Sequence, residues 1–205
     1  MSRGDGSGRR QWRGRLNVGF RWRDPRVEPN WFDLDGDQGL PSSAADVAFL
    51  RALRERATAR EWDCDSEDTF GFHAPHDGGL ILVVGLSFTD YETSKGLMTF
   101  ALTFDGNRVF GDQAHDQTYE FRGRTEAAFE YSGPGEQLVE RAAEWFEELL
   151  TWPIERREWY EGDRQVYREW MLSRTGRKLW VNGPQPPDAP PDKVVHVRGA
   201  RGGRA

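Results

Sequence analysis

Strand-type hydrophobic patterns are grouped in the middle of this chain, between two stretches with helical periodicity. The longest, Leu80–Phe88, is mostly apolar and rich in β-branched and aromatic residues, so it predicts a central strand buried on both faces. The runs Leu97–Phe104 and Arg108–Phe110 flank Asp105–Asn107, a hairpin signal because Gly and Asn tolerate positive φ. Strands massed in this way, with little βαβ alternation, favour an antiparallel α+β fold over a doubly wound one.

Two helices are marked by their ends and by their apolar stripes. Ser43, with Asp46 three residues later, forms a variant of the capping box and predicts a helix that ends near Ala59. The second helix is predicted to begin at Pro134, which a first turn tolerates, and to end before Pro153. Its apolar residues recur at helical spacing: Leu138, Ala142, Trp145, Phe146, Leu149 and Leu150.

Shorter patterns complete the predicted organisation. Apolar residues at every second position from Leu16 to Trp22 predict a half-buried strand before the first helix. Further strand-type runs are Phe70–Phe72, Thr118–Arg122, Ala127–Tyr131, Glu155–Tyr160, Val166–Ser173 and Lys178–Asn182. We therefore expect one α+β domain over residues 16–182, mainly an antiparallel sheet packed against two helices. Residues 1–15 and 183–205 are expected to be disordered tails because Gly, Pro and Arg dominate them.

Cysteine usage and hydropathy indicate the compartment. Cys64 is the only cysteine, so an intramolecular disulfide is excluded and a reducing compartment fits best. No apolar run is long enough to span a bilayer, and no apolar segment follows the charged N-terminus as in a secretory signal. We expect a cytoplasmic protein without a membrane partner. Asp63 and Asp65 flank Cys64 and would raise its pKa, which argues against a nucleophilic thiolate.

The charge is divided unevenly along the chain. The total is -6, but residues 1–26 carry +6 and residues 184–205 carry +2, so residues 27–183 carry -14. An acidic body favours docking on a basic protein partner, although solubility alone is an alternative explanation. Trp12 among the N-terminal arginines suits phosphate contacts and base stacking. The acidic body would repel DNA, so nucleic-acid binding is restricted to that tail.

Three alternating carboxylates form one candidate metal loop. Asp33, Asp35 and Asp37 stand in a turn-rich segment, and a hard cation needs several such oxygen ligands. The pattern departs from an EF-hand loop, because Gln38 replaces the expected Gly and Ala44 the bidentate Glu. The alternative is a solvated acidic turn.

Three of the four histidines form a second candidate. His73 and His76 are followed by Asp77, and His115 is followed by Asp116. Histidine and carboxylate together can hold zinc or iron and leave a position open for water. The first pair flanks Pro75 in an expected loop, so the alternative is a set of surface histidines. The sequence does not specify a cofactor.

Tryptophan is abundant, with nine residues in the chain. Several cluster in the second helix and the strands after it: Trp145, Trp152, Trp159, Trp170 and Trp180. We interpret them first as core residues, since large aromatics bury much area. If exposed beside an acidic surface, the first four would form a binding patch, because interfaces favour tryptophan anchors.

Two functional hypotheses from different classes follow. The first is an interaction protein whose acidic face captures a basic partner; the absence of catalytic pairing favours this class over an enzyme. In size and composition the chain is similar to short acidic bacterial proteins, which include immunity proteins of toxin systems. The second is a metal-dependent enzyme or metal-binding domain that uses His73, His76, His115 and the Asp33/Asp35/Asp37 loop.

Overall fold

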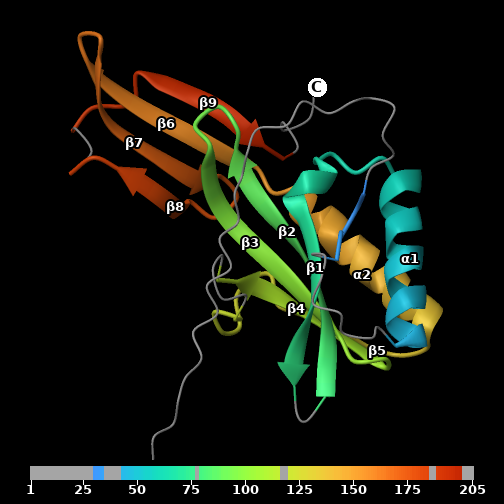
Figure 1. Ribbon diagram of the computed structural model, residues 1–205. Coiled ribbons are helices and arrows are strands. Elements are labelled where there is room, and N and C mark those ends of the chain that lie inside the picture. The colour runs from blue at the N-terminus through green and yellow to red at the C-terminus, as the bar shows by residue number, and fades with distance from the viewer. Residues whose placement is uncertain (1–29, 35–42, 77–78, 116–119, 185–187, 200–205) are drawn as a thin grey trace, which may run out of the picture.

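A computed structural model of the chain describes residues 30–34, 43–76, 79–115, 120–184 and 188–199. Within these ranges the protein has two α-helices and nine strands in two antiparallel sheets (Figure 1). The predicted α+β class, a mainly antiparallel sheet packed against two helices, is confirmed. The strand predicted at Leu16–Trp22 lies outside the described residues. No helix of the described chain is long and apolar enough to cross a membrane.

The larger sheet has five strands in the order β1-β2-β3-β4-β5. They are β1 (Thr69–His76), β2 (Gly79–Asp90), β3 (Lys95–Phe104), β4 (Arg108–Ala114) and β5 (Phe129–Ser132). The predicted hairpin between β3 and β4 is confirmed, and the Asp105 carboxylate accepts hydrogen bonds from the amides of Asn107 and Arg108. Of the strand predicted at Thr118–Arg122, the described part forms only an isolated bridge between Ala114 and Phe121.

Both helices cover the same face of this sheet (Figure 1). The helix α1 (Ala44–Ala59) begins at the predicted capping box: the Ser43 hydroxyl accepts from the Asp46 amide and the Asp46 carboxylate accepts from the Ser43 amide. The helix α2 (Gly135–Leu150) follows Pro134, which is the N-cap residue and not part of the first turn. Its apolar stripe is buried between α1 and the sheet.

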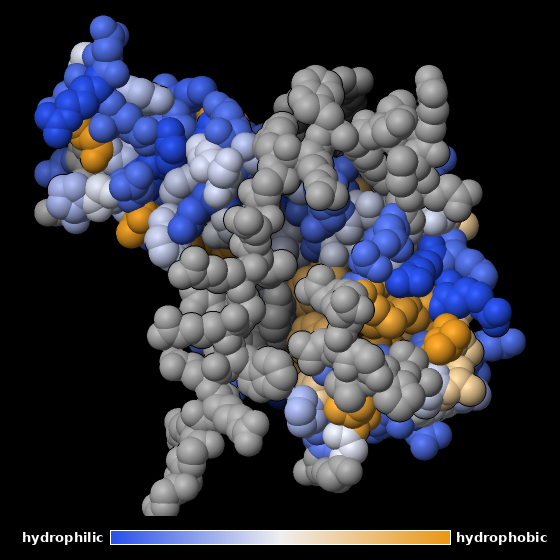
Figure 2. Space-filling model, viewed as in Figure 1, coloured by the Kyte–Doolittle hydropathy of each residue, from blue (hydrophilic) through white to orange (hydrophobic). Residues whose placement is uncertain are grey.

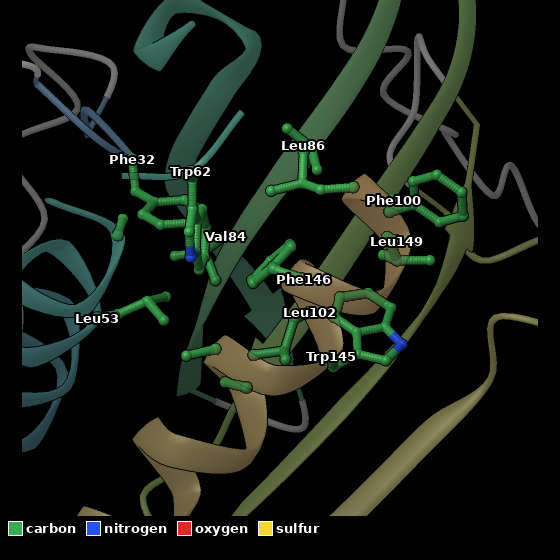
Figure 3. Close-up of a cluster of buried hydrophobic side chains, with 14 of the residues drawn as sticks. Phe32, Leu53, Trp62, Val84, Leu86, Phe100, Leu102, Trp145, Phe146 and Leu149 are labelled. Carbon is green, nitrogen blue, oxygen red and sulfur yellow. The ribbon is translucent and has the colours of Figure 1, made fainter. Parts of the chain in front are cut away.

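The core lies between the two helices and this face (Figure 3). Phe146 of α2 lies at its centre, with ring centroids 5.3 Å from Phe32 and 5.7 Å from Trp62. Trp145 and Trp152 both contact Phe100 of β3 edge to face. Burying a large apolar side chain contributes about 1.5–3 kcal/mol each, so these rings hold the helices on the sheet.

The second sheet has four strands in the order β8-β7-β6-β9 and lies beyond the closed end of the β2–β3 hairpin (Figure 1). They are β6 (Ile154–Glu161), β7 (Arg164–Leu172), β8 (Arg177–Asn182) and β9 (Lys193–Arg198). The first three correspond to the predicted meander. Most of the visible surface of this sheet is hydrophilic (Figure 2).

The strand β9 corrects the prediction of an unstructured tail from Gly183. It pairs antiparallel with β6, opposite Ile154 to Glu158. The segment before it is fixed as well, because Trp159 Nε1 donates to the Ala189 carbonyl and the Tyr160 amide donates to the Asp192 carboxylate. The Pro-rich composition concealed a short strand that depends on these distant partners.

Candidate functional site

The histidines predicted as metal ligands stand apart in the sheet. His73 and His76 lie on β1, while His115 follows β4, and β2 and β3 run between them. His73 Nε2 is 3.4 Å from the Asp46 carboxylate in the first turn of α1, with only 7% of its side chain exposed. Within the described ranges, no three His, Cys, Asp or Glu side chains converge as metal ligands would.

The predicted acidic metal loop is only partly described. Asp33 is exposed, and its backbone carbonyl accepts a hydrogen bond from the Gly71 amide. Asp35 and Asp37 lie outside the described residues, so the structure does not bring the three carboxylates together or separate them. The cation loop stays a prediction.

The four tryptophans considered as a binding patch are buried. Trp145, Trp152, Trp159 and Trp170 are 6%, 3%, 6% and 2% exposed, as the core interpretation expects. Trp145 lies on α2, Trp152 in the link between α2 and β6, and the other two on β6 and β7. Trp145 Nε1 donates to the Ala127 carbonyl. Trp180 of β8 is 49% exposed, with Lys95 Nζ 3.2 Å from its ring centroid.

A buried charged cluster around Arg156, absent from the sequence-based predictions, joins the two sheets. Arg156 of β6 is 1% exposed and donates through all three guanidinium nitrogens, each at 2.6 Å. Nε binds Glu158, Nη1 binds Asp90 at the end of β2, and Nη2 binds Glu92. The only sequence signal was a pair of charges at alternate positions of an expected strand, where an inward-facing position is normally apolar.

The environment of this cluster favours the ionised forms of Asp90 and Glu158. Burial would raise the pKa of Asp90, but hydrogen bonds from Trp170 and Arg156 outweigh it and hold the pKa below its usual value. Burial also opposes ionisation of Glu158, whose pKa is lowered by hydrogen bonds from Tyr160 and Arg156. Every guanidinium nitrogen is engaged by a side chain of the protein. The cluster is therefore suited to hold the sheets together and not to bind a substrate.

A second buried ion pair holds the end of β9. Arg198 Nη2 is 3.1 Å from the carboxylate of Asp68, which also accepts a hydrogen bond from the Tyr91 hydroxyl. Burial raises the pKa of Asp68, and the partners Tyr91 and Arg198 offset this only in part. The Arg198 guanidinium also lies 4.5 Å from the ring centroid of Phe88. The last described strand is thus attached to the larger sheet.

Exposed acidic residues stand along the connector between α1 and β1 and near the C-terminal end of α2. This acidic surface comprises Glu61, Asp63, Asp65 and Glu67 of the connector and Glu148 of α2, all exposed. Arg60 Nη1 is 2.9 Å from the Glu147 carboxylate, and Trp62 Nε1 donates to the same group at 3.0 Å. These contacts hold the start of the connector beside the C-terminal half of α2.

The charge differs between the two parts of the fold. Residues 27–153, which include both helices and the five-stranded sheet, contain 25 acidic and 9 basic residues. Residues 154–199, which include the four-stranded sheet, contain 7 acidic and 9 basic residues. The acidic character therefore belongs to the helical part of the molecule.

No protein-family model, curated protein or solved structure matches this chain. The functional argument accordingly rests on the residues and surfaces described above.

Proposed function

We propose that the protein binds a basic protein partner through the acidic surface, in the manner of an immunity protein that neutralises a toxin. One observation carries this proposal. Glu61, Asp63, Glu67 and Glu148 are exposed, and none of them has an ion-pair partner among the residues that the structure describes. A group of unneutralised carboxylates attracts lysine and arginine side chains and steers a basic protein toward the surface.

The neighbouring acidic residues play a different part. Glu140 and Glu147 of α2 are paired with Arg60, and Glu140 also lies 3.3 Å from Arg56. These pairs attach α1 and the connector to α2. Because the connector is held before any partner arrives, less conformational entropy is lost on binding than for an unattached acidic segment.

The test compares two variants with equal changes in charge. The first, Glu61→Gln, Asp63→Asn and Glu67→Gln, removes three charges from the acidic surface. The matched control, Glu161→Gln, Asp163→Asn and Asp188→Asn, removes three exposed charges near the four-stranded sheet. Each is used with the wild type to capture proteins from the native host, and partners are identified by mass spectrometry.

We expect the wild type and the control to retain the same basic protein and the first variant to lose it. Raising the salt from about 0.05 to 0.5 M should release the partner, since the Debye length is about 10 Å at 0.1 M and shortens with salt. Equal retention by the two variants, or retention that salt does not weaken, would contradict the proposal.

The alternative function, a metal-dependent enzyme or metal-binding domain, rests on the sequence pattern of the histidines and the aspartate loop. Elemental analysis of the purified protein tests it directly. Bound metal, together with a lower melting temperature after chelation, would favour this alternative.

A further inference from the structure

The strand β8 forms one edge of the four-stranded sheet, and most of its residues are open to solvent. Within the described chain it is hydrogen-bonded to one neighbouring strand, β7. Four of its six residues are exposed, among them Trp180 at 49% and Val181 at 45%. A shallow hollow of about 310 Å³ lies beside it, lined by Lys178, Leu179, Trp180 and Val181. An exposed, partly apolar edge strand is a site at which a further strand can add, because its outer amide and carbonyl groups can still pair.

The opposite edge of the same sheet is less open. Of the six residues of β9, only Lys193 and Val194 are exposed, and the other four are half-buried. The end of β9 is also attached to the larger sheet by the ion pair between Arg198 and Asp68. The edge at which the four-stranded sheet can be extended is therefore β8.

The charges around β8 favour a neutral occupant over an acidic one. The strand has two basic residues and no acidic residue, but both cations are paired within the chain. Arg177 Nη1 is 3.3 Å from the Glu126 carboxylate, and Lys178 Nζ is 2.7 Å from that of Glu169. The acidic excess belongs to the helical part, which lies on the far side of the molecule from β8 (Figure 1). Two copies that meet at β8 therefore keep their acidic parts apart.

The register of β8 on β7 shows which part of this edge is regular. Residues 180–182 pair in step with β7, and the register shifts at Leu179. A strand from a second copy can add most readily along the regular stretch. Identical strands that pair antiparallel at their edges are related by a two-fold axis. An axis through the middle residue, Val181, sets Val181 opposite Val181 of the second copy and Trp180 opposite Asn182.

We propose that β8 is a self-association surface, at which a second copy of this chain adds its own β8 antiparallel about a two-fold axis at Val181. The two four-stranded sheets then form one continuous sheet. Lys178 stands three residues from the axis, so the two lysines are about 20 Å apart and do not oppose each other. The contact is short and buries less than the roughly 1,200 Å² of a stable interface, so the dimer is reversible and forms at high protein concentration.

A cysteine placed on the axis tests this geometry in the full chain. Opposite residues of an antiparallel pair have Cα atoms about 4.5–5.5 Å apart, a distance that a disulfide can bridge. In a Cys64→Ser background, Val181→Cys should form a disulfide-linked dimer under mild oxidation at about 500 µM protein. The matched control is Val194→Cys, because Val194 is a surface valine of the other edge strand and is 53% exposed. It should cross-link about tenfold more slowly.

Sedimentation velocity measures the association without any cysteine substitution. The wild type should shift from monomer to dimer as its concentration rises from about 10 µM to about 1 mM. Val181→Lys sets two lysines directly opposite each other and should abolish the dimer, whereas Val194→Lys should leave it unchanged. Both valines are exposed, so neither substitution should unfold the protein, and equal melting temperatures verify this.

Four results would overturn the proposal. One is a wild type that stays monomeric at about 1 mM. Another is equal rates of cross-linking for Val181→Cys and Val194→Cys, and a third is equal loss of the dimer in the two lysine variants. The fourth is assembly that continues beyond two copies, because a two-fold contact at a single edge closes with the dimer.

Discussion

Replacing Arg156 by methionine should destabilise the protein far more than the same change at its neighbour Arg157. Arg156 is 1% exposed and binds Asp90 and Glu158, whose side chains are 3% and 2% exposed. Methionine keeps the apolar stem and most of the volume, so the change removes the charge with little cavity. What remains is two buried carboxylates without their main partner.

The size of the effect follows from those burial values. Breaking a buried ion pair by removing one partner costs about 3–5 kcal/mol, because an uncompensated charge is left behind. Asp90 keeps the hydrogen bond from Trp170, and Glu158 keeps Arg168 at 3.1 Å, so we expect the lower end, about 3 kcal/mol. For a domain of this size that corresponds to a fall in Tm of about 6–12 °C.

Arg157 provides the control because it lies next in the strand and makes an ion pair at the surface. Its Nη2 is 3.5 Å from the Glu155 carboxylate, and the two side chains are 34% and 32% exposed. Such a pair contributes about 0–1 kcal/mol, so Arg157→Met should stay within that range. The assay is urea unfolding followed by tryptophan fluorescence, with the free energy extrapolated linearly to water.

The pH dependence distinguishes the effect of an unpaired buried charge from that of lost packing. Without Arg156, burial would raise the pKa of Asp90 and Glu158 above their unfolded values, so the folded variant would gain stability from proton uptake as the pH falls. The difference in the free energy of unfolding between wild type and Arg156→Met should therefore become smaller as the pH falls from about 7 to 5. Two results would refute the reasoning: a difference in the free energy of unfolding that does not change with pH, or a loss of unfolding free energy within about 1 kcal/mol of that for Arg157→Met.

Three further outcomes test other parts of the structure. In the wild type, the pKa values of Asp90 and Glu158 are lower in the folded than in the unfolded protein. The stability that these two groups contribute is therefore present above their unfolded pKa and is lost as the pH falls through the lower folded values. The midpoint of urea unfolding should accordingly decrease below about pH 4. Gly85→Ala should lower the free energy of unfolding by about 1–3 kcal/mol, because the added Cβ would stand 2.0 Å from the Phe70 ring and 2.6 Å from the Phe100 carbonyl oxygen. The control is Gly96→Ala, where nothing lies within 4 Å of the added Cβ. It should change the free energy of unfolding by less than about 0.5 kcal/mol in the same assay. Burial raises the pKa of the Cys64 thiol to about 12, so its thiolate fraction at pH 8 is about a thousandfold lower than that of an ordinary thiol. A thiol reagent at pH 8 should therefore react much more slowly with the folded protein than with the urea-unfolded chain, and equal rates would contradict this assignment.

Elements with strong local patterns were predictable from the sequence. The capping box at Ser43, the stripe of α2 and the hairpin at Asp105–Asn107 all appear where the sequence placed them. Each depends on residues within a few positions of one another, so its signal is complete in a short window. The burial of the tryptophans also followed from the preference of large aromatics for the core.

Features that depend on distant residues were not predictable. Arg198 binds Asp68, 130 positions earlier, and this contact helps to hold a strand that the Pro-rich tail concealed. Arg156 and Asp90 are 66 positions apart, and the residues around each do not indicate the other as a partner. A period-two pattern identifies which residues face inward, but it does not say that an inward arginine will meet two carboxylates, Asp90 and Glu92, from elsewhere in the fold.

The same distinction applies to the charge that motivates the proposed function. The net charge of -6 is the sum of an acidic helical part, a four-stranded sheet with a slight basic excess, and basic ends. This division becomes visible once β6 to β9 are recognised as a separate sheet. Buried charges contribute little to docking because neighbouring side chains of opposite charge neutralise them, as around Arg156. Under the proposed function, a basic partner would interact with the exposed carboxylates of Glu61, Asp63, Glu67 and Glu148. Binding should therefore depend on Glu61, Asp63 and Glu67 rather than on net charge, since the matched control changes the net charge by the same amount.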